Sequence, residues 1–388
     1  MGRYLNPGME SFEKSVNSEI YVDKTGLVGY TNRVMNTVQG YVCVSRPRRF
    51  GKSMAANMLT AYYSRGCDSR EIFSKFEISE SPDFEKYRNK YNTIFLNMQE
   101  FLSRSDSVEA LVDRVKKLVL RDLKREYPDV DYFDDTDLVE SMQDIYETEK
   151  CPFVVIIDEW DCIFHKDFIT DEDKKKYISF LSSLLKDKAY VLLSYMTGIL
   201  PIAKYSSGSE LNMFAEYTMV SEEKFSDAFG FTETEVDMLY ARFLKNTGKP
   251  LLSRSGLKEW YDGYHTAAGE RLYNPRSVVC ALTDNQLSNY WVSSGKYDSI
   301  FTYIQYNVDQ IQNDLTLMFA GERIPSGIQE YAATAQELKT KEEIYSAMVV
   351  YGLLTYDNGM VFIPNKELME VLKWELVMIK KQKNSPVK

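Results

Sequence analysis

The segment VSRPRRFGKS, residues 44–53, decides the fold. It follows YVCV at 41–44, a short apolar run that favours a β-strand, and it precedes the helix-forming run 54–63, which Gly66 ends. A strand, a loop and a helix in this order are what a phosphate-binding loop requires. The usual pattern is G-x-x-x-x-G-K-[ST], and Arg46 stands here in place of the first glycine.

The missing glycine leaves the essential parts of such a loop in place. Successive backbone N–H groups and the helix N-terminus form the anion cradle, so a glycine is needed where the backbone approaches the phosphates, as Gly51 does. Lys52 would bring positive charge to the outer phosphates, and Ser53 would offer its hydroxyl to a metal. Pro47 favours an extended Arg46, so the turn can be built without the first glycine. The segment therefore predicts a nucleotide site.

The arginines of this loop have more than one interpretation. Arg46, Arg48 and Arg49 could add phosphate contacts or reach a neighbouring subunit as an arginine finger. Equally, they could pair with acidic groups on the surface.

A second signal lies at 153–161, FVVIIDEWD. Five consecutive apolar residues are typical of a strand buried on both faces of a parallel sheet. Asp158 and Glu159 follow at its carboxyl end, the edge where open α/β sheets bind ligands. Asp158 would orient the Mg²⁺ shell, and Glu159 would position and deprotonate the attacking water. Asp161 could support the acid pair from behind or simply be exposed, and we expect it to be exposed.

The remaining patterns predict an α/β protein. Further strands are expected at 93–97 and 190–196, with helices at 108–123, 138–146 and 171–186, which gives a parallel sheet covered by helices. From about residue 222 the chain becomes mostly helical, with a capping box at 232–235 and an Asn-Pro helix start at 274–275. A helix at 342–351 precedes an Asn-Gly hairpin at 353–363. We expect a P-loop core at 1–221, a helical lid at 222–285 and a small winged-helix-like region at 286–388.

Composition narrows the class of protein. The 388 residues are 44% hydrophobic and 27% charged, which is ordinary for a globular protein. No apolar run approaches the roughly 20 residues that span a bilayer, so we expect a cytoplasmic protein without a membrane segment. The five cysteines are scattered, and with only two histidines they do not predict a zinc site. A net charge of −10 argues against a surface built to coat nucleic acid.

In these residues the chain resembles the predicted AAA-ATPase-like family of bacterial and archaeal proteins, a divergent branch of P-loop ATPases. RPRRFGKS and the strand followed by DEWD carry the likeness. Further blocks resemble the family: YVDKT at 21–25, TGILPI at 197–202, FGFT at 229–232, YNP at 273–275 and Trp291. The arginine in place of glycine is itself part of the family pattern.

The resemblance implies ATP and Mg²⁺ as cofactors and assigns roles to the site residues. Lys52 and Glu159 would be catalytic, Ser53 and Asp158 would hold the metal, and Thr197 would sense the γ-phosphate, although a turn or N-cap hydroxyl is an equal alternative. Residues 23–25 could border the nucleotide or cap a helix. The nucleotide-binding set would be Arg48, Arg49, Phe50, Gly51, Lys52, Ser53 and Met54.

The function that these patterns favour is an Mg²⁺-dependent ATPase. It would couple its nucleotide state to lid movement and to a protein partner, a second copy of the chain or nucleic acid. The alternatives are a nucleotide-dependent switch or scaffold that does not hydrolyse ATP, and a DNA-binding adaptor. Many members of the family continue into a PD-(D/E)XK nuclease-like domain, whereas this chain ends soon after residues 363–366, so we expect no nuclease activity from it.

Overall fold

Strand β3 (Phe153–Asp158) is buried along its whole length, as the apolar run predicts. In the computed structural model, the described residues are 2–166, 169–202, 209–220, 223–291, 311–328, 338 and 340–383. The chain forms two compact units. The first contains Met1–Ser45 and Lys52–Tyr217, and the second contains Arg46–Gly51 and Thr218–Lys388.

The first unit is built on a five-stranded sheet in the order β2-β3-β4-β1-β5. Its other strands are β1 (Tyr41–Ser45), β2 (Asn92–Asn97), β4 (Val191–Gly198) and β5 (Ala215–Tyr217). All neighbouring strands are parallel. The predicted parallel sheet is therefore confirmed, and its central strands are those with the most continuous apolar runs.

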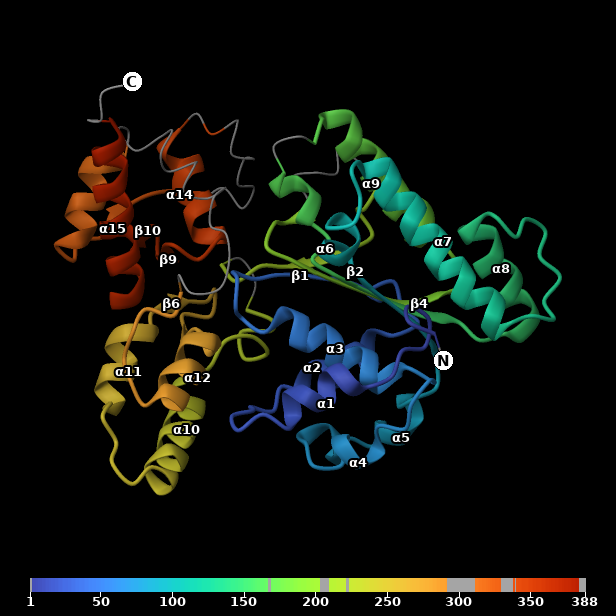
Figure 1. Ribbon diagram of the computed structural model, residues 1–388, viewed down its shortest axis with the longest axis horizontal. Coiled ribbons are helices and arrows are strands. Elements are labelled where there is room, and N and C mark those ends of the chain that lie inside the picture. Colours follow the sequence, from blue (N-terminus) through green and yellow to red (C-terminus); the bar gives the residue numbers. More distant parts are fainter. Residues whose placement is uncertain are drawn as a thin grey trace. The chain divides into compact units, whose positions relative to one another are not determined.

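Helices cover both faces of this sheet (Figure 1). On one face lie helices α1, α2 and α3, with the short α4 and α5 beside them; on the other lie α6, α7, α8 and α9. Their bounds are α1 Glu10–Val16, α2 Gly26–Val34, α3 Lys52–Tyr63, α4 Arg70–Phe73, α5 Phe84–Tyr87, α6 Met98–Leu102, α7 Val108–Glu126, α8 Leu138–Glu149 and α9 Asp171–Leu185. Two short 3-10 helices, η1 (Glu77–Glu80) and η2 (Cys162–His165), complete the unit.

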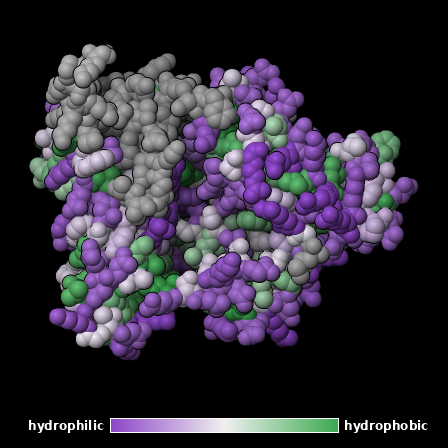
Figure 2. All heavy atoms as spheres, in the orientation of Figure 1, coloured by the Kyte–Doolittle hydropathy of each residue, from purple (hydrophilic) through white to green (hydrophobic). Residues whose placement is uncertain are grey.

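Helix α7 shows how the amphipathic pattern is used. Its buried side chains include Leu111, Val115 and Val119, at the three- and four-residue steps that predict a helix with one apolar face. Ser107 caps its first turn by accepting the N–H of Ala110. Figure 2 shows that the outward surface of α7 and α8 is mainly hydrophilic, with a few hydrophobic residues between the polar ones.

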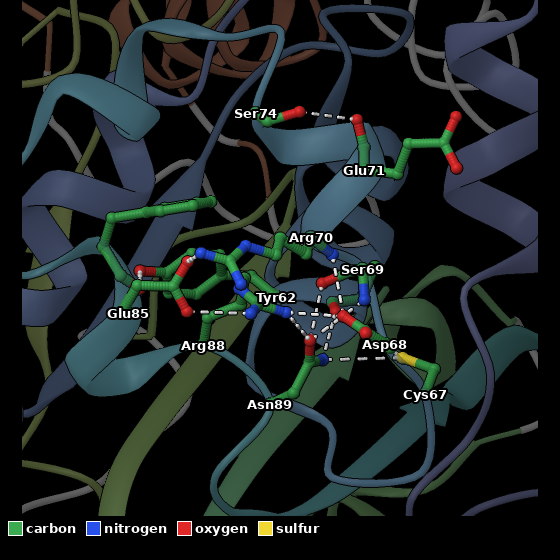
Figure 3. A network of polar contacts seen from close by, with 12 residues as sticks. Tyr62, Cys67, Asp68, Ser69, Arg70, Glu71, Ser74, Glu85, Arg88 and Asn89 are labelled. Carbon is green, nitrogen blue, oxygen red and sulfur yellow. Dashed lines mark hydrogen bonds and ion pairs between the residues drawn. The ribbon is translucent and has the colours of Figure 1, made fainter.

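The C-terminal end of α3 is held by the side chain of Asn89 (Figure 3). Its amide nitrogen donates to the carbonyl oxygens of Ala61 and Ser64, at 3.0 and 2.7 Å. Its amide oxygen accepts the N–H of Ser69 at 3.0 Å and a guanidinium N–H of Arg88 at 2.8 Å. The last carbonyls of a helix have no partner within the helix. At the end of α3, the helix that follows the glycine-lysine-serine motif, the Asn89 side chain satisfies the carbonyl of Ala61, and the backbone N–H groups of Asn89 and Tyr91 satisfy those of Tyr62 and Tyr63.

The second unit is mainly helical outside residues 46–51. Its elements are α10 (Glu233–Asn246), α11 (Arg254–Tyr261), α12 (Pro275–Asp284), α14 (Lys341–Val350) and α15 (Lys366–Lys383), with a hairpin of β6 (Tyr264–His265) and β7 (Arg271–Leu272). Strands β8 (Ile324–Pro325), β9 (Thr355–Asp357) and β10 (Met360–Phe362) form an antiparallel sheet in the order β8-β10-β9.

The local signals in this half of the chain are confirmed. Thr232 forms the predicted capping box of α10 with Glu235. Asn274 caps α12, whose first residue is proline. Asn358 and Gly359 both have positive φ, at 48° and 79°, as a two-residue hairpin turn between β9 and β10 requires. The domain boundaries expected at 221–222 and 285–286 stay a prediction, and the first of them falls outside the described residues.

Candidate functional site

Asp158, the last residue of β3, is the centre of the candidate site. Its side chain is buried, with 1% exposed. One carboxylate oxygen accepts the Thr197 hydroxyl at 2.6 Å, and the other accepts the Asn97 side-chain amide at 3.2 Å. Asn97 and Asp158 end β2 and β3, and Thr197 is the last residue but one of β4, so the parallel register brings all three to one edge of the sheet. Both oxygens of the carboxylate are thereby held in a fixed orientation.

This contact decides what the Thr197 hydroxyl does in the structure. Thr197 is fully buried in β4, and its hydroxyl donates to Asp158 rather than capping a helix. The N-cap alternative is therefore not what the structure shows. A role in sensing the γ-phosphate stays a prediction.

Asn97 is a site residue that the sequence analysis missed. It ends β2 and pairs in register with Asp158. Its amide oxygen also accepts the N–H of Glu100, so it caps the start of α6. The available signal was a polar residue directly after an apolar strand, the same signal that identified Asp158.

Glu159, directly after β3, has an unusual backbone. Its φ is +54°, in the left-handed region, which costs a residue other than glycine about 1 kcal/mol. The following residue, Trp160, donates its N–H to the carbonyl oxygen of Thr197 at 3.0 Å, and Cys162 donates to the carbonyl oxygen of Glu159 at 3.1 Å. Neighbouring strand β4 therefore helps to hold the turn that carries the acid pair.

The expectation that Asp161 is exposed is wrong. Its side chain is buried, and one carboxylate oxygen accepts the N–H groups of Ile199 and Leu200 at 2.9 and 2.8 Å. The same oxygen lies 3.2 Å from Nε2 of His165. Burial acts to raise the pKa of Asp161, but the hydrogen bonds from His165, Leu200 and Ile199 hold it below its usual value. Asp161 thus ties the turn after β3 to the segment that follows β4.

The glycine-lysine-serine motif leads into α3 as predicted. Gly51 has φ of +90°, and a Cβ added there would meet no atom within 4 Å. Lys52 and Ser53 are the first residues of α3, with Lys52 buried and Ser53 exposed. Because the first N–H groups of a helix have no partner within it, this end of α3 can accept an anion. Met54, also in the predicted set, is exposed.

Residues 46–51 of the same loop pack with the second unit. The buried guanidinium of Arg46 donates to the carbonyl oxygen of Phe225 at 3.3 Å and lies over the ring of Phe229 at 5.4 Å. The ring of Phe50 packs edge-on against Tyr264, with centroids 5.0 Å apart. The loop is therefore held by side-chain contacts of Arg46 and Phe50.

Arg49 is also held within the second unit. It has φ of +72°, donates to the carbonyl oxygen of Tyr290 at 2.8 Å and places its guanidinium 5.5 Å from the Trp291 ring centroid. Burial, and then the nearby charge of Arg276, lowers the pKa of Arg49 to about 10. These contacts involve a carbonyl group and an aromatic ring rather than surface acids. Phosphate contacts by Arg49 and by the partly exposed Arg48 stay predictions.

The YVDKT block serves a structural purpose in the first unit. The carboxylate of Asp23 accepts the N–H of Thr25 at 2.8 Å and the N–H of Glu77 at 2.7 Å. The Thr25 hydroxyl accepts the N–H of Ile78 at 3.1 Å. These bonds join the start of α2 to η1, which agrees with the capping alternative for this block.

The donor set fits magnesium bound together with a nucleotide. Among the described residues, no group of three or more His, Cys, Asp and Glu side chains could hold a metal by itself. Mg²⁺ in nucleotide sites characteristically uses one or two protein oxygens, with phosphates and waters as the other ligands. The Asp158 carboxylate and the exposed Ser53 hydroxyl are donors of that kind.

Sheet order and site residues together define a P-loop ATPase type of fold. The loop follows β1, and the buried acid ends β3, which is separated from β1 by β4. Residues 6–207 match the family described as Predicted AAA-ATPase, and the chain belongs to this family. It is therefore an AAA-ATPase-like protein.

The individual proteins that resemble this chain share little sequence identity with it. An uncharacterized protein in the vnfD 5′ region of Azotobacter chroococcum mcd 1 is 24% identical over 300 residues, which are 74% of this chain and 53% of that protein. The chain thus spans about half the length of this curated relative.

Among solved structures, the ORC2 protein of Aeropyrum pernix in ADPNP–ADP complexes is similar, with TM-score 0.45, 12% identity and coverage of 95% of this chain and 98% of that one. A Walker-type ATPase of Pyrococcus abyssi has TM-score 0.46 and 11% identity, with coverage of 90% of this chain and 94% of that one.

No helix in the described part of the chain is both long enough and apolar enough to cross a membrane.

Proposed function

We propose that this chain binds ATP with Mg²⁺ and hydrolyses it. The observation that carries the proposal is the buried Asp158 carboxylate, whose two oxygens are held by Thr197 and Asn97 at the carboxyl edge of a parallel sheet. A buried carboxylate is costly unless it is hydrogen-bonded, so an acid kept there and oriented from both sides is well suited to a metal-bound water shell.

Each proposed role follows from position and chemistry. Lys52 neutralises the outer phosphates at the start of α3, and Ser53 contributes a hydroxyl to the metal. Mg²⁺ would supply charge neutralisation for the phosphates. Glu159 follows the metal-binding acid and orients the attacking water as its base. Backbone N–H groups of residues 48–51 and the N-terminus of α3 receive phosphate oxygens.

The second unit would convert nucleotide state into an output. We propose a protein partner, or a second copy of this chain, rather than DNA. The start of α14 carries Glu342 and Glu343, and the chain as a whole has a net charge of −10. Negative charge of this kind opposes contact with a phosphodiester backbone. Binding to duplex DNA that weakens steeply with salt would contradict this choice.

The enzymatic proposal is tested by phosphate release from ATP with and without Mg²⁺. The wild-type protein is expected to release phosphate only with the metal, and Glu159→Gln is expected to bind ATP and lose turnover. Turnover in Glu159→Gln equal to that of the wild type would remove the assigned base. Tight ATP binding without any turnover in the wild type would instead support a non-hydrolysing switch.

A further inference from the structure

Glu367, in the first turn of α15, is a fully buried carboxylate. It accepts the Ser277 hydroxyl at 2.9 Å and the backbone N–H groups of Tyr290 and Trp291 at 2.8 and 2.9 Å. Ser277 lies in the first turn of α12. One carboxylate therefore joins the starts of α12 and α15 to residues 290–291.

Residues 290–291 also hold the loop arginine. Tyr290 donates its N–H to Glu367 and accepts Arg49 Nη1 at its carbonyl oxygen, 2.8 Å away. Trp291 donates its N–H to the same carboxylate, and its ring lies 5.5 Å from the Arg49 guanidinium. The guanidinium and the carboxylate thus share the same short peptide segment, and their opposite charges attract each other.

The backbone of Arg49 needs such support. With φ of +72°, Arg49 occupies a region that costs a residue other than glycine about 1 kcal/mol, and such residues persist only where the surroundings hold them. Arg49 lies two residues before Gly51, within the stretch whose N–H groups would line the anion cradle. A loop that is fixed before the ligand arrives binds more tightly, because less ordering is needed on binding.

We propose that Glu367 is a positioning residue for the phosphate loop. Through Tyr290 and Trp291 it holds Arg49, and with it residues 46–51, in the conformation that accepts the nucleotide's phosphates. Binding of a nucleotide to the loop would then also stabilise the starts of α12 and α15. The inference rests on the proposed function, because it names the part of the second unit that regulates the nucleotide site.

The test compares Glu367→Gln with the wild type at a pH of about 8.5, where Glu367 carries its charge even though burial raises its pKa to about 7. Glutamine keeps the shape and one acceptor oxygen but removes the charge, and the matched control is Glu370→Gln, which removes an exposed charge from the same helix. We expect Glu367→Gln to raise the KM for ATP and the Kd for ADP by about tenfold. We expect kcat at saturating ATP to stay within about threefold of wild type, since the reacting groups are untouched. Glu370→Gln is expected to match the wild type.

Two further measurements separate positioning from a purely structural role. Arg49→Met combined with Glu367→Gln is expected to weaken ATP binding by less than the product of the two single effects, because both changes break one connection. In the wild type, ATP is expected to slow amide hydrogen exchange in peptides covering 286–291 and 365–372. This second measurement needs no variant, so it decides the case even if Glu367→Gln does not fold.

The outcomes are distinguishable. If the wild type binds ATP while exchange in both peptides stays unchanged and Glu367→Gln keeps or improves its ATP affinity, the inference is overturned and the proposed function stands. If the wild type does not bind ATP at all, the proposed function fails, and the inference falls with it.

Discussion

Replacing Thr197 by valine removes the hydrogen bond to Asp158 while keeping the shape and the strand preference of the side chain. The bond is 2.6 Å long, and both side chains are buried. A hydrogen bond to a charged group contributes about 1.5–3 kcal/mol, and its loss leaves Asp158 with only the Asn97 amide of its two side-chain donors. We therefore expect Thr197→Val to lower the free energy of unfolding by about 2 kcal/mol.

Urea unfolding followed by tryptophan fluorescence measures this loss as a lower midpoint at an unchanged slope. Thr197→Ser is the matched control, since it keeps the hydroxyl and should regain most of the stability. Phosphate release by Thr197→Val should fall by about tenfold to a hundredfold, because the carboxylate proposed to bind the metal is then held at one oxygen only. A Thr197→Val protein with wild-type stability and turnover would refute the assigned contact.

Three further predictions concern stability. Burial raises the pKa of Glu367 from 4.5 to about 7, so the charged form of this side chain destabilises the fold. Relative to Glu367→Gln, the free energy of unfolding of the wild type should therefore fall by about 3 kcal/mol as pH rises from 4.5 to 7. Equal dependence of stability on pH in the two proteins would contradict this. Asn89→Ala should lower the free energy of unfolding, measured with denaturant, by about 3 kcal/mol. Asn89→Gly should lower it by less, because glycine tolerates the φ of +54° at this position. Equal stability of the wild type and Asn89→Ala would show that the Asn89 side chain does not hold the end of α3. Exposed Lys150 follows the last residue of α8 and has φ of +52°, so Lys150→Gly should raise the free energy of unfolding by about 0.5–1 kcal/mol. A lower free energy of unfolding in Lys150→Gly would instead show that the lysine side chain stabilises the fold.

Local patterns predicted most of the sheet. The runs at 41–44 and 153–157 are apolar without interruption, and such runs form central strands because both of their faces are covered. Strand β5 was not predicted. It has only three residues, Ala215–Tyr217, of mixed polarity, and its strand conformation depends on pairing with β1. Pairing between segments far apart in the chain leaves no local signal.

Some residues of the candidate site could likewise be predicted from local sequence, and others could not. Asp158 could be found because an acid after a buried strand stands out in the sequence. Asp161 was placed wrongly because an acid in DEWD is typical of a solvated turn, and its burial depends on N–H groups at 199–200. Glu367 gives no signal, since an acid in the first turn of a helix is common. Its partners come from residues 277 and 290–291, which only the tertiary fold brings to it.

Isothermal titration of ATP into the wild type and Lys52→Ala, each with Mg²⁺, tests the central claim most directly. The wild type is expected to bind one ATP per chain, and Lys52→Ala is expected to show no measurable binding while keeping its thermal stability without nucleotide. Equal ATP affinity in the two proteins would contradict a phosphate site at the start of α3.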